Sequence, residues 1–160
     1  MIVADANLLI NYVCGTPLSD MAQQVNRQDP DWVSPPLWKA EVLNGLLVMH
    51  RAGLMSLDRA VLAYRNAAAA TSDPLREDNP DAILTTAQDA GLTAYDAIYV
   101  TLARSLGIPL VTEDGKILRT CPDVARSMRQ FLEPPESSMT VREKPATYKT
   151  ARKSGKGAKA

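Results

Sequence analysis

Short apolar runs alternate along this chain with longer segments in which apolar residues recur at helical spacing. The runs Ile2–Asp5 and Pro109–Thr112 are rich in β-branched residues and bounded by turn or helix-start residues, so they predict buried strands. Trp32–Ser34 predicts a third strand, and the loop over 72–78 predicts a further short one around Leu75. Strands that alternate with helices are typical of an α/β protein built on a parallel sheet.

The helical segments carry recognisable start and stop signals. Ser34 and Pro35 fit an N-cap and a first turn, and glycines at 53, 91 and 107 fit the positions just after helix ends. Helices are predicted over 6–13, 17–27, 35–52, 57–70, 79–90, 93–106 and 114–120.

Two of these helices have informative apolar patterns. The 35–52 helix is apolar on more than one side, which predicts burial on two fronts or packing against a second subunit. The 57–70 helix carries one apolar stripe, so it should have a single solvated face. The first pattern consists of Val42, Leu43, Leu46, Leu47 and Met49, and the second of Leu57, Val61, Tyr64 and Ala68.

Composition and charge divide the chain in two. Residues 1–132 hold 11 Lys/Arg against 15 Asp/Glu and form one predicted domain, whereas 133–160 hold 7 against 3. The second segment is rich in Pro, Ser, Gly and Lys, so we expect a basic, disordered C-terminal tail. No apolar run approaches the roughly 18 residues of a membrane span. The first strand leaves no room for a signal peptide, so we expect a cytoplasmic protein.

Four acidic residues lie at the edges of apolar segments. Asp5 and Asp114 follow two predicted strands, and the carboxyl ends of parallel strands gather functional groups at one edge of a sheet. Asp96 lies in the first turn of a helix, and Glu41 stands inside an apolar stretch where a charge needs a partner. Two carboxylates about 5 Å apart repel by roughly 3 kcal/mol at an effective dielectric near 20. A cluster of this kind favours a hard divalent cation such as Mg²⁺.

Each acid also has a purely structural interpretation. Asp5 and Asp114 fit helix N-caps, and Asp96 fits a capping box with Thr93. Glu41 fits a solvated helix position. The sequence leaves these interpretations open beside the metal site.

The segments around the acids resemble the motifs of PIN-domain ribonucleases. The resemblance lies in Ile2–Asn7, Glu41–Asn44, Leu92–Val100 and Leu110–Asp114, covers roughly residues 1–130, and is greatest to VapC-type toxins of type II toxin–antitoxin systems. It implies a three-layer α/β/α fold with a short, mostly parallel central sheet. It also implies a homodimer, a cognate antitoxin protein and RNA as the substrate.

The resemblance further implies Mg²⁺ or Mn²⁺ held by the matched acids Asp5, Glu41, Asp96 and Asp114. RNA phosphodiester bonds would then be hydrolysed by in-line attack of a metal-activated water. We expect the three aspartates to bind metal directly and Glu41 to act through a water molecule. Asn7 and Thr112 match small polar positions that support the acids, and Glu113 is a further candidate oxygen donor.

Other residues bear on the mechanism and its rivals. Cleavage without metal usually needs two acid–base groups, and the single histidine, His50, is explained by its place near a helix C-terminus. A phosphatase with an Asp nucleophile would need a second acid where Asn7 stands. A catalytically silent PIN fold that binds nucleic acid or antitoxin remains the alternative. The basic residues of the tail predict salt-sensitive binding to RNA, and a terminus that only increases solubility is the other interpretation. These residues are Lys144, Lys149, Arg152, Lys153, Lys156 and Lys159.

Overall fold

The computed structural model describes residues 1–74 and 79–133. Within them the strands are β1 (Ile2–Ala4), β2 (Trp32–Val33), β3 (Thr71–Ser72), β4 (Leu110–Val111) and β5 (Ala125–Arg126). They form one sheet in the order β3-β2-β1-β4-β5, and every neighbouring pair is parallel. The predicted parallel sheet is confirmed, and β1 and β4, which precede Asp5 and Asp114, lie side by side in it.

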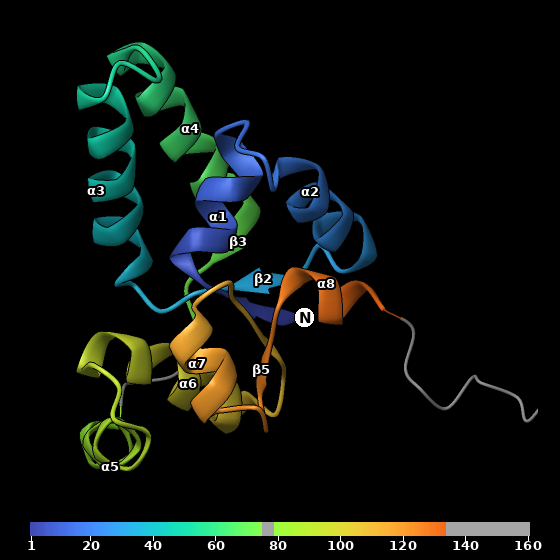
Figure 1. The fold of residues 1–160 in the computed structure, drawn as a ribbon, viewed down its shortest axis with the longest axis vertical. Coiled ribbons are helices and arrows are strands. Elements are labelled where there is room, and N and C mark those ends of the chain that lie inside the picture. Colours follow the sequence, from blue (N-terminus) through green and yellow to red (C-terminus); the bar gives the residue numbers. More distant parts are fainter. Residues whose placement is uncertain (75–78, 134–160) are drawn as a thin grey trace, which may run out of the picture.

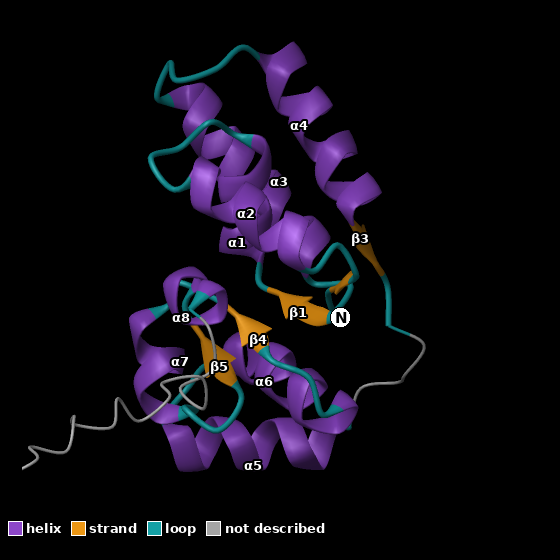
Figure 2. Cartoon of the chain, turned by 90° about the vertical axis from the view of Figure 1, so that its right-hand side faces the viewer, coloured by secondary structure: helices purple, strands orange, loops and turns teal. Residues whose placement is uncertain are grey.

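Helices cover both faces of this sheet. Figure 2 shows α1, α2, α3 and α4 on one side of the strands and α5, α6 and α7 on the other, which confirms the three-layer arrangement. Figure 1 shows α8 beside the sheet, and this helix packs against α2. Within the described residues, no helix combines the length and apolar character that crossing a membrane requires. The helices are α1 (Ala6–Val13), α2 (Ser19–Gln28), α3 (Trp38–Arg51), α4 (Leu57–Ala70), α5 (Pro80–Ala90), α6 (Ala94–Leu106), α7 (Gly115–Thr120) and α8 (Met128–Leu132).

The buried face of α4 is not the predicted apolar stripe. Ala60, Ala63 and Ala67 are buried, while Leu57 and Val61 are 56% and 45% exposed. Packing of α4 against α1 and α3 selects the alanine face, because small side chains allow helices to approach closely. The larger apolar side chains of α4 are therefore left on the outside.

Helix α3 packs against both α1 and α4, but part of its apolar pattern stays uncovered. Val42 and Leu46 are buried, but Leu43 and Leu47 are 52% and 37% exposed. Burial within one chain therefore does not account for the whole pattern, and packing against a second subunit remains a prediction for the exposed leucines.

Ser34 is not the N-cap of α3. That helix begins at Trp38, and the residue before it, Leu37, makes no side-chain cap. Ser34 is instead fully buried, and its hydroxyl donates to the Ala4 carbonyl at 2.6 Å and accepts from the Thr71 hydroxyl at 3.1 Å. This serine ties the carboxyl ends of β1, β2 and β3 together, and an apolar–polar pattern does not distinguish that role from capping.

Several short elements differ from the sequence-based expectation. The strand expected around Leu75 and the tail over 134–160 lie outside the described residues; the edge strand that the structure does show, β3, ends at Ser72. Strand β5 and helix α8 were not predicted, because Ala125–Arg126 contains no β-branched or aromatic residue and a five-residue helix is too short to show a period.

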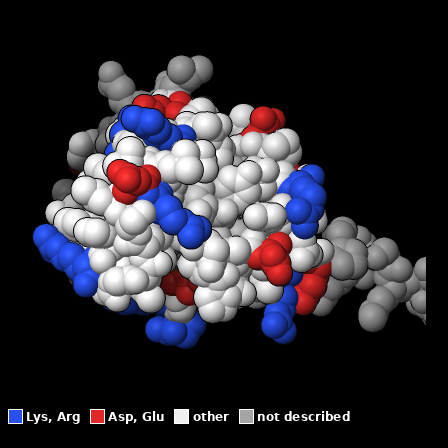
Figure 3. All heavy atoms as spheres, turned by 90° about the horizontal axis from the view of Figure 1, so that it is seen from above, with Lys and Arg blue, Asp and Glu red and all other residues white. Residues whose placement is uncertain are grey.

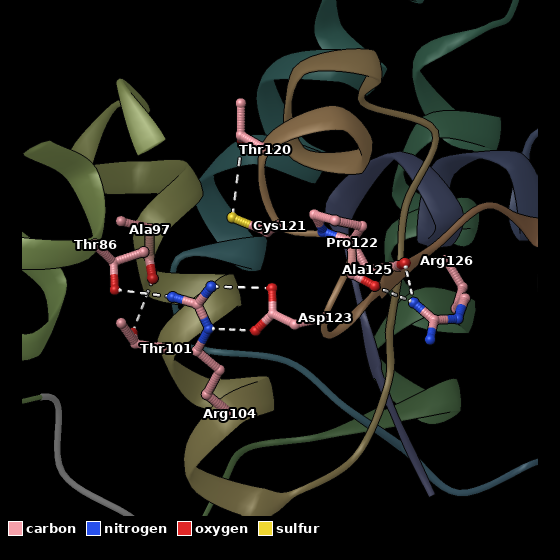
Figure 4. Close-up of polar contacts among 10 residues, drawn as sticks. All are labelled: Thr86, Ala97, Thr101, Arg104, Thr120, Cys121, Pro122, Asp123, Ala125 and Arg126. Atoms are coloured by element: carbon pink, nitrogen blue, oxygen red, sulfur yellow. Dashed lines mark hydrogen bonds and ion pairs between the residues drawn. The ribbon is translucent and has the colours of Figure 1, made fainter. Parts of the chain in front are cut away.

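A polar cluster joins the helices below the sheet to the segment that leads into β5. Figure 4 shows the guanidinium of Arg104 on α6 between Thr86 of α5 and Asp123. Arg104 donates to both carboxylate oxygens of Asp123, at 2.8 and 3.1 Å, and to the Thr86 hydroxyl at 3.3 Å. The hydrogen bonds from Arg104 lower the pKa of Asp123. This cluster is structural, since it lies away from the carboxyl edge of the sheet at which Asp5 and Asp114 follow β1 and β4.

Candidate active site

The fold brings the acidic positions toward one edge of the sheet. Asp5 directly follows β1, and Asp114 follows the end of the neighbouring strand β4. Glu41 lies in the first turn of α3, and Asp96 lies in the first turn of α6. Since α3 and α6 are in opposite helical layers, the two faces of the sheet each contribute an acid.

Asp5 is the most constrained of the four acids. It is 8% exposed, and its Oδ2 accepts from the Thr112 hydroxyl at 2.5 Å and from Asn7 Nδ2 at 2.7 Å. Its Oδ1 accepts from the Ala6 backbone amide at 2.7 Å, so it also begins α1. The structure thus places Asn7 and Thr112 in direct hydrogen-bond contact with Asp5.

The electrostatics of Asp5 reflect its acidic neighbours. Burial raises the pKa of Asp5 to about 6, and the hydrogen bond from Thr112 opposes that shift. The negative charges of Glu41 and Asp114 raise this pKa further. Asp5 therefore lies within electrostatic reach of acids from both α3 and the end of β4.

Glu41 has a partner that the sequence did not reveal. Its Oε2 accepts from the Tyr99 hydroxyl at 2.5 Å, across the boundary between α3 and α6. Burial raises the pKa of Glu41, the Tyr99 hydrogen bond opposes the shift, and the charge of Asp96 adds to it. The sequence feature that could have indicated this contact is the hydroxyl of Tyr99, which lies three residues after Asp96 on an otherwise apolar side of the helix.

Asp96 and Asp114 do form the structural caps that the sequence allowed. Asp96 Oδ2 accepts from the Thr93 backbone amide at 3.3 Å and from its hydroxyl at 2.7 Å. Asp114 Oδ1 accepts from the backbone amides of Lys116 and Ile117 at 2.7 and 2.9 Å.

Capping uses one oxygen of each of these carboxylates. From residues 1–74 and 79–133, no hydrogen bond reaches Asp96 Oδ1, Asp114 Oδ2 or Glu41 Oε1. The structural interpretation and the metal interpretation are therefore compatible at each residue.

The chemistry of this donor set fits a hard divalent cation. The ion pairs within the described part of the chain involve Asp29, Asp73 and Asp123, so none of the four site acids is neutralised by a Lys or Arg there. Carboxylate oxygens are the ligands that Mg²⁺ and Mn²⁺ prefer. Over the same residues, no three His, Cys, Asp or Glu side chains stand close enough to form a ready-made metal site. Binding an ion therefore requires the carboxylates to move closer together.

The remaining candidates have other contacts or lie elsewhere. Glu113 Oε1 accepts from the Met128 backbone amide at 2.8 Å, so this carboxylate contacts the start of α8. His50 Nδ1 lies 3.0 Å from the Met55 carbonyl near the end of α3, a structural contact. The six basic tail residues lie outside the described residues.

Comparison with known proteins assigns this arrangement to a family. The family model of the PIN domain matches residues 2–121, a span that contains all four acids. The chain therefore belongs to the PIN-domain family, which is a family of nucleases. The crystal structure of PAE2754 from Pyrobaculum aerophilum is similar, with 25% identity and a TM-score of 0.65 over 80% of this chain and 90% of that one. No curated protein matches the chain.

The raised pKa of Asp5 predicts the pH dependence of stability in metal-free protein. Between its usual pKa of 3.8 and the folded value of about 6, the folded state binds more protons than the unfolded state. Stability should therefore fall as pH rises through this window, by about 1–2 kcal/mol between pH 5 and 8. Denaturant unfolding in the presence of a chelator measures this change.

Two variants control the measurement. Asp5→Asn should flatten the profile, because it removes the titrating group, whereas Asp89→Asn on the exposed side of α5 should leave it unchanged. A wild-type stability that is constant or rises from pH 5 to 8 would contradict a buried Asp5 carboxyl with a raised pKa.

Proposed function

We propose that this protein is a metal-dependent ribonuclease that hydrolyses RNA phosphodiester bonds with Mg²⁺ or Mn²⁺. The observation that supports this most strongly is a set of electrostatically coupled acids, without basic partners in the described residues, at the carboxyl edge of a PIN-family sheet. Asp5, Asp96 and Asp114 are the proposed direct ligands, and Glu41 is the proposed water-mediated ligand.

Each residue has a distinct proposed role. A bound ion would supply an acidified water molecule and would neutralise charge on the phosphodiester. Asp5 is held by Asn7 and Thr112, so it is the fixed ligand toward which the others move. Glu41, whose pKa is raised by burial, is the proposed acceptor of a proton from that water.

We propose further that the protein is the toxin of a toxin–antitoxin pair and acts in the cytoplasm. This proposal is based on the amino-acid sequences of segments 92–100 and 110–114, which resemble those of VapC-type toxins. The frequent occurrence of toxins in this family also supports it. A silent PIN-fold module that only binds nucleic acid or an antitoxin is the second candidate. The presence of all four matched acids favours the enzyme.

The outer face of α3 and α4 is the proposed homodimer surface. Exposed Leu43, Leu47, Leu57 and Val61 surround an almost wholly apolar groove of about 280 Å³. A two-fold dimer buries the same patch of both copies, so one apolar face can cover the other without a further partner. The cognate antitoxin is then expected to bind elsewhere on the toxin or across the dimer.

Residues 1–132 carry more acidic than basic side chains, 15 against 11. Figure 3 shows positive and negative side chains scattered over the face seen from above, without a continuous basic stripe on it. The basic sequence over 133–160 is therefore the proposed origin of sequence-independent attraction to RNA.

Wild-type protein should cleave RNA with Mn²⁺ or Mg²⁺ and stop when a chelator is added. Asp96→Asn keeps the capping oxygen but removes the charge, so it should lower cleavage by more than about 100-fold, since even an outer-shell change costs 10–100-fold. Asp89→Asn, an exposed acid on α5, is the matched control. In cells, the wild type should arrest growth and Asp96→Asn should not.

The outcomes separate the two candidates. Cleavage that survives the chelator or the Asp96→Asn change would rule out the metal mechanism. Metal binding without cleavage of any RNA would support the silent module instead.

Leu43→Glu combined with Val61→Glu should convert a dimer into a monomer of 17.4 kDa, as measured by light scattering or sedimentation. Charges placed in an apolar interface remain unpaired on burial. Leu84→Glu, at a residue 63% exposed on α5, is the control and should remain dimeric. A wild type that is monomeric at high concentration, or a double variant that still dimerises, would exclude this face.

Removal of residues 133–160 should weaken RNA binding mainly at low salt. The slope of log K against log salt should become shallower by about 0.7 for each phosphate that the tail neutralises. Filter binding or fluorescence anisotropy from low to physiological salt measures both quantities. Equal affinities and slopes for the full chain and the truncated protein would show that the tail does not bind RNA.

A further inference from the structure

The phenol of Tyr99 is buried among the candidate acids. Tyr99 follows Asp96 by one turn of α6, and its side chain is 2% exposed. Its hydroxyl crosses to α3 and donates to Glu41 Oε2 at 2.5 Å. The charges of Glu41 and Asp5 both add to the effect of burial in raising the pKa of Tyr99, so this phenol lies near both acids and remains a donor.

The acceptor of the Tyr99 hydroxyl is a carboxylate of another helix. A buried hydroxyl requires a hydrogen-bond partner, and the phenol lies at the end of a long ring that carries it away from the backbone of α6. Tyr99 donates to one oxygen of the Glu41 carboxylate, whose other oxygen receives no hydrogen bond from the described residues.

We propose that Tyr99 is a positioning residue for the divalent ion: its hydroxyl fixes the Glu41 carboxylate so that Oε1 is presented toward the ion. This inference rests on the proposed metal site. Long glutamate side chains have many rotamers, and a charge-assisted hydrogen bond selects one before the ion arrives. Outer partners that orient metal-binding groups in this way commonly change metal affinity when they are removed.

Mn²⁺ affinity of the RNA-free protein tests the proposal without relying on catalysis. Tyr99→Phe keeps the ring and its packing but removes the hydroxyl, so the dissociation constant for Mn²⁺ should rise by about 10–100-fold. Electron paramagnetic resonance of free Mn²⁺ gives this constant directly. Tyr95→Phe is the matched control: it makes the same chemical change on the same helix, at a side chain 63% exposed, and should leave the constant unchanged.

A double-mutant cycle shows whether Tyr99 acts through Glu41. In a Glu41→Ala background, the further change Tyr99→Phe should have no additional effect on Mn²⁺ affinity, because the group it positions is absent. Equal losses in both backgrounds would indicate a general effect on the fold and would overturn the proposal. Melting curves of all four proteins accompany the cycle, and a purely structural role would change them without changing the affinity.

The outcomes separate this inference from the proposed function. Unchanged Mn²⁺ affinity in Tyr99→Phe, with RNA cleavage intact, overturns the positioning role and leaves the ribonuclease standing. Tyr99-dependent Mn²⁺ binding in a protein that cleaves no RNA supports the positioning role and contradicts the ribonuclease. A wild type that does not bind Mn²⁺ overturns both.

Discussion

The burial of an acid beside other acids, with no basic side chain of the described residues to neutralise them, is the constraint on which the site depends. Burial raises the pKa of Asp5, and the charges of Glu41 and Asp114 raise it further. Such an arrangement destabilises a folded protein unless protons or a cation reduce the charge. Its presence at the carboxyl edge of the sheet is understandable if a divalent ion is the normal counter-charge.

Each of these acids makes structural hydrogen bonds that fix the position of its side chain in the fold. Asp5 and Asp114 are the N-caps of α1 and α7, and Asp96 completes the capping box of α6, so the backbone orients these three side chains. Glu41 does not cap α3, and Tyr99 supplies the orienting contact in its place. The second oxygens of Asp96, Asp114 and Glu41 accept no hydrogen bond from the described residues.

The main features of the fold were predictable because they depend on local patterns. The two central strands are continuous apolar runs, and the long helices have clear periods and caps, including the capping box of Thr93. Ser34, the alanine face of α4 and the Tyr99–Glu41 contact were not predictable, because each depends on which element packs opposite. For the site, spacing placed acids at one edge, but it did not reveal that they stand too far apart for a preformed centre in the described residues.

A crystal structure with Mn²⁺ would show whether these acids bind an ion, because the anomalous scattering of manganese locates the ion independently of the protein atoms. We expect one or more peaks at the carboxyl edge of β1 and β4, bonded to Asp5, Asp96 and Asp114, with Tyr99 still hydrogen-bonded to Glu41. Peaks at other acids only, or none at a saturating Mn²⁺ concentration, would contradict the proposed metal site.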